Sequence, residues 1–248
     1  MKTTIIVPVY NRPNTLKIAI RSLLRQHDAA DLDILIVDDG STDQTPDVVA
    51  DLVANHALVR SVHREHGGVA KARNTGLDNL LDETEIVTFL DSDDVSVAGR
   101  FAADVPILVQ RPDIEVTYGN MVLTRAIDPV TLQPSIEAAQ TEITSIHLSC
   151  ALMRRSLIDR IGRFDESLRL SEDTDYLLRI FETGTRFVQT TTVCLYYLQH
   201  AGGMTRDIAA GRKYFALAVM KSMQRRKADP TLILDRPTFD IKLAPDFM

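Results

Sequence analysis

Short apolar runs alternate with helical patterns along the first half of the chain. Four of these runs predict buried strands, at residues 4–9, 34–37, 59–63 and 86–90. Apolar residues recur at helical spacing after each of the first three runs, and Pro13 suits the first turn of the first helix. Repeated strand–helix units are typical of an α/β fold with a mostly parallel central sheet and helices on both faces.

The alternation loosens after about residue 112. Residues 128–140 contain two prolines and many polar side chains, and this composition predicts an irregular, exposed stretch. Helical patterns return at residues 156–161 and 172–182, and a final helix is predicted from 208 to about 226. The second half therefore predicts helices more clearly than strands.

Polar residues follow three of the predicted strands. The loops after the first, second and fourth strands read Tyr10-Asn11-Arg12, Asp38-Asp39-Gly40-Ser41 and Asp91-Ser92-Asp93-Asp94. Ligands of open parallel sheets collect beyond the carboxyl ends of the strands. We therefore expect the three loops to form one composite site.

Three carboxylates follow the fourth strand, at Asp91, Asp93 and Asp94. Mg²⁺ and Mn²⁺ prefer oxygen ligands and keep positions open for water and phosphate. A diphosphate could fill those positions, and the metal would neutralise charge that develops on a leaving group. The alternative is a solvated turn whose Asp and Ser residues cap the next helix. The two other polar loops at the same edge favour the metal interpretation.

A second acidic group, Glu172, Asp173 and Asp175, opens a predicted helix. Acidic residues are common in a first helical turn because the helix dipole favours them there. Asp173 could accept a proton from a reacting hydroxyl if the fold brings it beside the metal loop. Asp175 points elsewhere around the helix, so we expect it to hold structure or an acceptor.

Composition narrows the class of protein. The 248 residues are 45% apolar and 25% charged, which is ordinary for a globular chain, and the net charge of −6 disfavours nucleic-acid binding. No secretory signal pattern and no membrane-spanning run are expected. Cys150 and Cys194 are far apart and are expected to be free thiols, which favours a cytoplasmic location.

Five segments in order resemble the inverting family-2 glycosyltransferases. They are Val7-Pro8-Val9-Tyr10-Asn11-Arg12, Val37 to Asp43, Gly68 to Gly76, Leu90 to Asp94, and Gly162 to Glu166 followed by Glu172-Asp173. The resemblance implies the Rossmann-like GT-A fold over residues 1–205. It divides that domain into a nucleotide-sugar-binding half (1–111) and an acceptor and catalytic half (112–205). A C-terminal helix and tail (206–248) follow.

The resemblance also implies roles for individual residues, with a nucleoside-diphosphate sugar, often a UDP-sugar, as donor. The implied nucleotide-sugar contacts are Pro8, Val9, Tyr10, Asn11, Arg12, Asp39, Lys71, Arg73, Asp91 and Ser92. The implied ligands of Mn²⁺ or Mg²⁺ are Asp91, Asp93, Asp94 and His200, the last being the single histidine for which a site role is expected. Asp173 matches the family's catalytic base. Leu198 stands where the family usually has a basic residue, which weakens a phosphate contact there.

Alternatives remain at this point. A nucleotidyltransferase is disfavoured because no glycine-rich loop follows the first strand, and a dinucleotide oxidoreductase is disfavoured for the same reason. A non-catalytic nucleotide-sugar binder or partner subunit stays open. The acceptor could be a glycan, a lipid-linked sugar or a small molecule.

The C-terminal helix carries Lys221 and the run Arg225-Arg226-Lys227 beside several apolar residues. Such a helix could lie on the inner face of a membrane, form a homodimer contact or pack on its own domain. Apolar stripes on helices are most often buried in their own protein. We therefore favour packing on the domain, with any membrane association peripheral.

Overall fold

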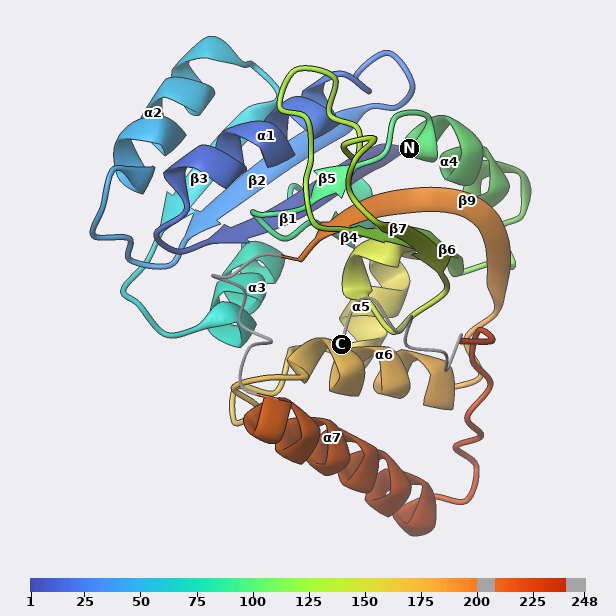
Figure 1. The fold of residues 1–248 in the computed structure, drawn as a ribbon. Helices are drawn as coiled ribbons and strands as arrows, with labels where there is room; N and C mark the ends of the chain where they lie inside the picture. Colours follow the sequence, from blue (N-terminus) through green and yellow to red (C-terminus); the bar gives the residue numbers. More distant parts are fainter. Residues whose placement is uncertain (200–207, 240–248) are drawn as a thin grey trace.

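The computed structural model describes residues 1–199 and 208–239. Within this part of the chain, nine strands form one sheet in the order β3-β2-β1-β4-β8-β6-β9-β5, with β7 paired to β6 (Figure 1). The strands are β1 (Lys2–Val9), β2 (Leu32–Asp38), β3 (Val59–His63), β4 (Thr84–Phe89), β5 (Val95–Ser96), β6 (Val116–Thr124), β7 (Gln140–Ile143), β8 (Ala151–Arg154) and β9 (Phe187–Leu198).

The first four strands are parallel neighbours. β1 pairs with β2 on one side and β4 on the other, and β2 pairs with β3. Every residue of β2, and seven of the eight in β1, are buried. Strands covered on both faces need nearly continuous apolar runs, which is why the sequence predicted them. The predicted α/β fold class is confirmed.

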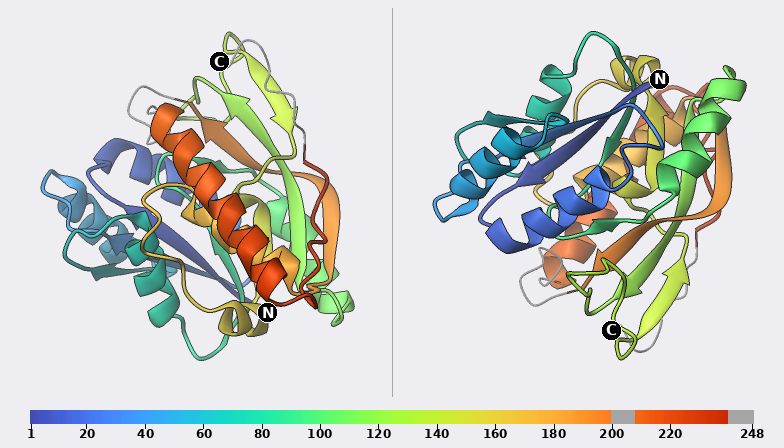
Figure 2. Two further views of the ribbon diagram at one scale, coloured as in Figure 1. Left: turned by 90° about the horizontal axis from the view of Figure 1, so that it is seen from below. Right: turned by 90° about the horizontal axis from the view of Figure 1, so that it is seen from above.

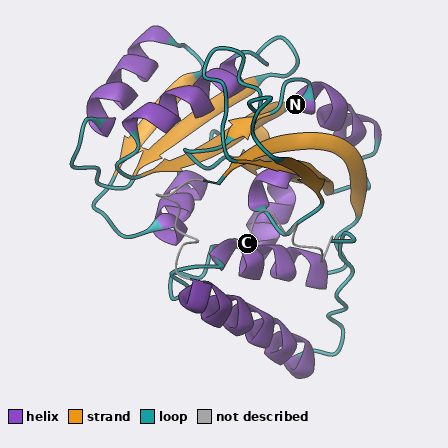
Figure 3. Ribbon diagram, viewed as in Figure 1, coloured by secondary structure: helices purple, strands orange, loops and turns teal. Residues whose placement is uncertain are grey.

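Helices cover both faces of this sheet (Figures 1 and 3). One layer consists of α1 (Pro13–Leu24), α2 (Thr45–Asn55) and α4 (Arg100–Gln110); the other consists of α3 (Val69–Asp78), α5 (Arg155–Ile161) and α6 (Glu172–Glu182), with the short 3-10 helix η1 (Leu148–Cys150) leading into β8. α7 (Ile208–Ala228) lies outside α6 and forms a further layer (Figure 2). The two views of Figure 2 place α7 on the side of the molecule opposite α1 and α4.

The second half of the chain extends the same sheet. β8 lies between β4 and β6 and is antiparallel to both. β9 runs parallel to β6 and also pairs with β5, the two-residue strand that follows the acidic turn. Residues 128–139 lie in loops and turns, as the sequence predicted, whereas Gln140, the last residue of the predicted irregular stretch, begins β7.

Two glycines permit close backbone approaches. Gly40, directly after β2, has φ of +74°, and a Cβ there would lie 2.6 Å from the backbone nitrogen of His66. Gly76 in α3 faces Ile6 of β1, and a Cβ there would lie 2.4 Å from the Ile6 side chain. Only glycine allows both contacts without displacing a neighbour.

α7 packs on its own domain, as we favoured from the sequence. Arg225 pairs with Asp175 and Glu182 of α6 at 2.8 Å each. Lys221 pairs with Asp165 in the loop before α6. None of the described helices combines the length and apolar composition that crossing a bilayer requires.

Candidate active site

The loops that follow β1 and β2 are joined by hydrogen bonds. The backbone N–H of Asn11 donates to the Ser41 hydroxyl at 3.0 Å, and the N–H of Thr42 donates to the Asn11 side-chain oxygen at 2.8 Å. The N–H of Arg12 donates to the Thr45 hydroxyl at 2.9 Å. Asn11 has φ of +51°, a conformation that Asn tolerates better than most residues. The two polar loops therefore form a single structural unit.

An aromatic surface lies on this unit. The rings of Tyr10 and His66 are stacked with centroids 4.0 Å apart and planes 24° apart. Both side chains are exposed, whereas Pro8 and Val9 are buried in β1 beneath them. A stacked, exposed ring pair offers a flat π-face of the kind on which nucleobases stack.

Asp39 is buried beneath that surface and holds the segment after β3. Its carboxylate accepts backbone N–H bonds from Gly67 at 3.1 Å and Gly68 at 2.8 Å, and it pairs with Arg64. The His66 ring nitrogen Nδ1 is 2.9 Å from Asp39 Oδ2. Asp39 thus shapes the loop that carries His66, and its expected contact with the nucleotide sugar stays a prediction.

The acidic turn after β4 meets a histidine from the second half of the chain. His147, directly before η1, places Nε2 3.8 Å from Asp91 Oδ2 and 3.9 Å from Asp94 Oδ2. The three ligand-capable atoms lie within 4.8 Å of one another. That spacing is close to the distance across the coordination sphere of a cation with bonds of about 2.1 Å. Among the described residues, this is the group of carboxylates and histidine best arranged to hold a metal.

The donor chemistry of this group fits a divalent cation. Asp94 Oδ2 is buried and has no hydrogen-bond partner, while Oδ1 accepts the N–H of Leu198 at 3.0 Å. Burial, with the nearby carboxylates of Asp93 and Asp91, raises the pKa of Asp94 well above its usual range. A buried carboxylate oxygen without a partner would gain most from a bound positive charge.

Asp91 is oriented by a buried arginine. Arg73 of α3 donates to Asp91 Oδ1 at 2.8 Å and pairs through its other terminal nitrogen with Glu172 of α6. Burial alone would lower the pKa of Arg73, but Asp91 and Glu172 outweigh it and raise that pKa. Burial, together with the charge of Asp173, raises the pKa of Glu172 to about 7 despite the Arg73 contact. One guanidinium therefore connects the acidic turn to the first turn of α6.

Asp173 and Asp175 have different surroundings on α6. Asp173 is half-buried; its Oδ1 accepts the N–H of Thr174 at 2.7 Å, and Oδ2 has no hydrogen-bond partner within the described ranges. Asp175 is buried and pairs with Arg179 at 3.0 Å and with Arg225 at 2.8 Å. Asp173 thus keeps one carboxylate oxygen without an internal partner, whereas Asp175 holds structure, which is one of the two roles expected for it.

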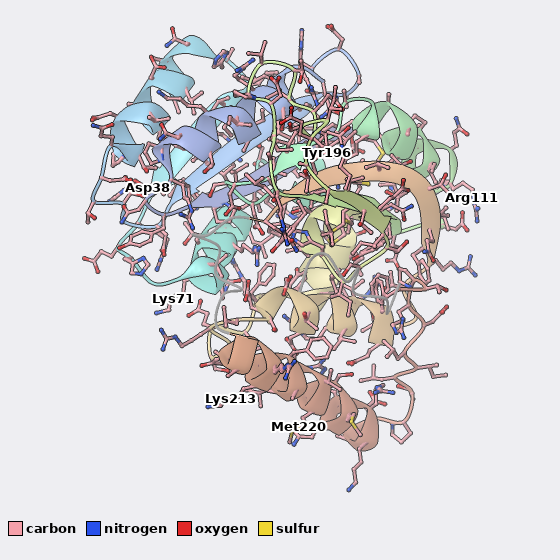
Figure 4. All side chains as sticks on the ribbon, in the orientation of Figure 1. Asp38, Lys71, Arg111, Tyr196, Lys213 and Met220 are labelled. Carbon is pink, nitrogen blue, oxygen red and sulfur yellow. The ribbon has the colours of Figure 1, made fainter. Side chains whose placement is uncertain are left out.

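The structure brings most of the sequence-predicted site residues to one region. Arg12 lies 4.0 Å from Asp93 and so connects the loop after β1 with the acidic turn. Asp93 is outside the Asp91–Asp94–His147 group. Ser92 is buried in the turn, and Lys71 is exposed on α3 (Figure 4). The predicted ligand His200 lies outside the described residues.

His147 is the residue that sequence reasoning missed. It precedes a strand that the sequence did not predict, so nothing placed it at the sheet edge. Its ring packs edge-on against Tyr197 with centroids 5.3 Å apart. Its Nδ1 accepts the N–H of Ser149 at 3.3 Å, which leaves Nε2 facing the two carboxylates.

Curated relatives are glycosyltransferases or proteins of polysaccharide biosynthesis. The chain is 26% identical over 219 residues to the uncharacterized glycosyltransferase EpsJ of Bacillus subtilis, covering 82% of this chain and 62% of EpsJ. It is 30% identical over 199 residues to the pre-mycofactocin glycosyltransferase of Mycobacterium tuberculosis, covering 74% of this chain and 40% of that protein. The succinoglycan biosynthesis protein ExoW of Rhizobium meliloti is 27% identical over 195 residues, covering 69% and 60%. The chain thus spans between two fifths and just over three fifths of these relatives.

Solved structures share the fold. Staphylococcus aureus TarS 1–349 in complex with UDP-GlcNAc superposes with a TM-score of 0.70 at 21% identity, covering 89% of this chain and 66% of that one. The mannosyltransferase PcManGT from Pyrobaculum calidifontis, in complex with GDP-Man and Mn²⁺, gives 0.65 at 21% identity, covering 92% and 64%. The family model described as "Glycosyl transferase family 2" matches residues 4–162, from β1 to the end of α5. With that match over more than half of its length, the chain belongs to glycosyl transferase family 2.

Proposed function

We propose that the protein is a metal-dependent, inverting glycosyltransferase. It would transfer a sugar from a nucleoside-diphosphate sugar to an acceptor hydroxyl. The observation that carries this proposal is the position of Arg73, which contacts Asp91 of the acidic turn and Glu172 beside Asp173. Arg73 thus lies between the group that could hold a metal, which includes Asp91, and the first turn of α6, which carries Asp173.

Asp91, Asp94 and His147 would hold the cation. The imidazole in this set favours Mn²⁺ over Mg²⁺, because Mg²⁺ prefers oxygen ligands alone. To ligate through Nε2, His147 would carry its proton on Nδ1 and give up the 3.3 Å bond from Ser149, at a cost of about 1 kcal/mol. When bound, the cation supplies positive charge for the departing diphosphate.

The Tyr10–His66 ring pair would receive the nucleobase. Arg12, 4.0 Å from Asp93, would add positive charge for phosphate oxygens near the acidic turn, and the exposed Lys71 would add charge from α3. We propose a UDP-sugar as donor, an assignment supported by the resemblance and by the likeness to the UDP-GlcNAc complex of TarS. The side chains of Asp39, Arg64 and His66 would set the shape of this base site.

Asp173 would act as the general base. Its unpartnered Oδ2 would accept the proton of the acceptor hydroxyl as that oxygen attacks the anomeric carbon. The bond to the diphosphate breaks on the opposite face, so one displacement inverts the anomeric centre. No covalent intermediate with the protein is needed.

The test is a screen of nucleotide sugars with Mn²⁺ or Mg²⁺, following release of the nucleoside diphosphate. Asp173→Asn should lower release at least about 100-fold while donor affinity stays unchanged. Asp47→Asn, which makes the same change in the first turn of α2 at an exposed position, is the matched control. The anomeric configuration of the product, read by NMR, tests inversion.

Three outcomes would contradict parts of the proposal. Donor binding without release under any acceptor condition would favour the non-catalytic nucleotide-sugar binder. Unchanged release in Asp173→Asn would remove Asp173 from the role of base. Release that persists after metal chelation would exclude dependence on a divalent cation.

A further inference from the structure

The inner face of α7, which packs on α6, is small and polar. Ala218 and Ser222 are fully buried there. Lys221 and Arg225 reach across to carboxylates of the α6 region, where Arg225 meets the buried Glu182 at 2.8 Å. Ion pairs and the close packing of small side chains therefore hold α7 against α6, and the large apolar side chains of α7 contribute little to this contact.

Met220 and Met223 of α7 point the other way. Met220 and Met223 are 53% and 59% exposed, whereas Phe215, which is 45% exposed, lies one heptad before the buried Ser222 and so on the inner side of the helix. Figure 4 labels Met220 and Lys213 on the side of α7 away from α6. Exposed large apolar side chains gathered on one helix mark an interaction surface more often than chance.

Basic side chains accompany these apolar ones. Arg212, Lys213 and Lys227 are exposed and Arg226 is half-buried, and no carboxylate in the described part of the chain forms an ion pair with any of the four. The helix sequence contains six basic residues and no acidic one, although the whole chain has a net charge of −6. We call this surface the α7 outer face: Arg212, Lys213, Met220, Met223 and Lys227.

We propose that the α7 outer face binds the surface of an anionic lipid bilayer. The two methionines would enter the headgroup boundary while the cations of this face meet lipid phosphates. A second copy of the chain is the less suitable occupant, because an isologous contact would place this cationic face against itself. The proposal stands whether or not Asp173 is a catalytic base.

The position of α7 gives this contact a consequence for the site. α7 packs directly on α6, and the first turn of α6 carries Asp173. Packed helices lie about 8–10 Å apart. A bilayer under the α7 outer face would therefore lie one helix layer from Asp173, within reach of an acceptor carried on a lipid.

The test is flotation of the full chain with vesicles. Vesicles of phosphatidylcholine alone are compared with vesicles of equal parts phosphatidylcholine and phosphatidylglycerol, at low and high salt. Binding is expected only with the anionic lipid and should weaken as salt rises. Lys213→Gln with Lys227→Gln should weaken partitioning about fivefold for each cation. Met220→Gln with Met223→Gln should weaken it by a similar factor for each methionine, since each is already about half buried.

The matched control is Lys17→Gln with Val109→Gln. These residues are exposed on α1 and α4, in the layer on the other side of the sheet, and should leave binding unchanged. Equal binding to neutral vesicles, or equal loss in the control, would overturn the proposal. So would a native dimer in light scattering that Met220→Gln with Met223→Gln converts to a monomer, because the face would then serve self-association. Thermal unfolding of each variant shows whether the fold is kept.

Discussion

Replacement of Arg73 by methionine is the perturbation that most directly tests the connection between α3, the acidic turn and α6. Methionine keeps much of the side-chain volume and removes the charge. Glu172, whose side chain is 5% exposed, would lose its cationic partner. Asp91 would lose the same partner but is 27% exposed, so water can compensate part of its loss.

The expected cost is large and depends on pH. Breaking a buried ion pair by removing one partner typically costs about 3–5 kcal/mol. The pKa of Glu172 is already raised to about 7 from 4.5, so the stability it contributes falls as pH rises from about 4.5 to about 7 in the native chain. Without Arg73 the folded pKa rises further, and the fall continues above pH 7. The cost of the substitution therefore grows by about 1.4 kcal/mol for each pH unit above 7.

The assay is urea unfolding of the native chain and of Arg73→Met at about pH 6 and about pH 8.5. The free-energy difference between the two chains should be about 2 kcal/mol larger at the higher pH. Adding Glu172→Gln to Arg73→Met should remove that pH dependence, because the amide does not titrate. A cost that is the same at both pH values, or a pH dependence that persists in the double variant, would refute this account of Glu172.

Three further predictions follow from single contacts. Mn²⁺ binding should release protons and tighten as pH rises, because Asp94, whose pKa is raised, must lose its proton before it can bind the metal. Calorimetry in buffers of different ionisation enthalpy measures the proton release, and binding heats that do not depend on the buffer would contradict the prediction. Gly40→Ala should cost about 2–4 kcal/mol in urea unfolding, since it adds both backbone strain and a contact 2.6 Å from the His66 nitrogen. Gly68→Ala, at φ of +91° with open space around it, should cost only about 1–2 kcal/mol, and equal costs would argue against the contact. Arg225→Leu should lower the free energy of unfolding by about 3 kcal/mol and speed proteolysis within α7, because Asp175 and Glu182 are buried and would each lose a cationic partner. An unchanged rate of digestion would show that other contacts hold α7.

The N-terminal half of the fold was predictable from the sequence because its strands are local and because β1, β2 and β4 are buried on both faces. The predicted strand at 59–63 and helix at 172–182 match β3 and α6 at both ends. The loops after β1, β2 and β4 were expected at one edge because parallel strands place their carboxyl ends together. The structure confirms that hydrogen bonds join the loops after β1 and β2, and the approach of Arg12 to Asp93 brings the loop after β4 to the same edge.

The strands of the second half and the position of His147 were not predictable, because their sequence patterns are weak or their contacts are with segments distant along the chain. β5 and β8 have two and four residues, too short to show a period. β9 carries the polar run Gln189 to Thr192 and is only partly buried, so its pattern does not identify a strand. His147 reaches Asp94 only through the pairing of β8 with β4, a contact between segments more than sixty residues apart along the chain.

The position of β8 limits how this protein can be recombined with its relatives. β8 is inserted between β4 and β6, so the chain returns to the N-terminal strands after it has already formed β6. A chimera that exchanged residues 125–160 as one block, to change acceptor preference, would also replace β8, the strand that pairs with β4. Crossover points at 125 and 146 would instead keep β8, η1 and His147 with their native neighbours. They would transfer only the loops and β7, which lies outside the main order of the sheet.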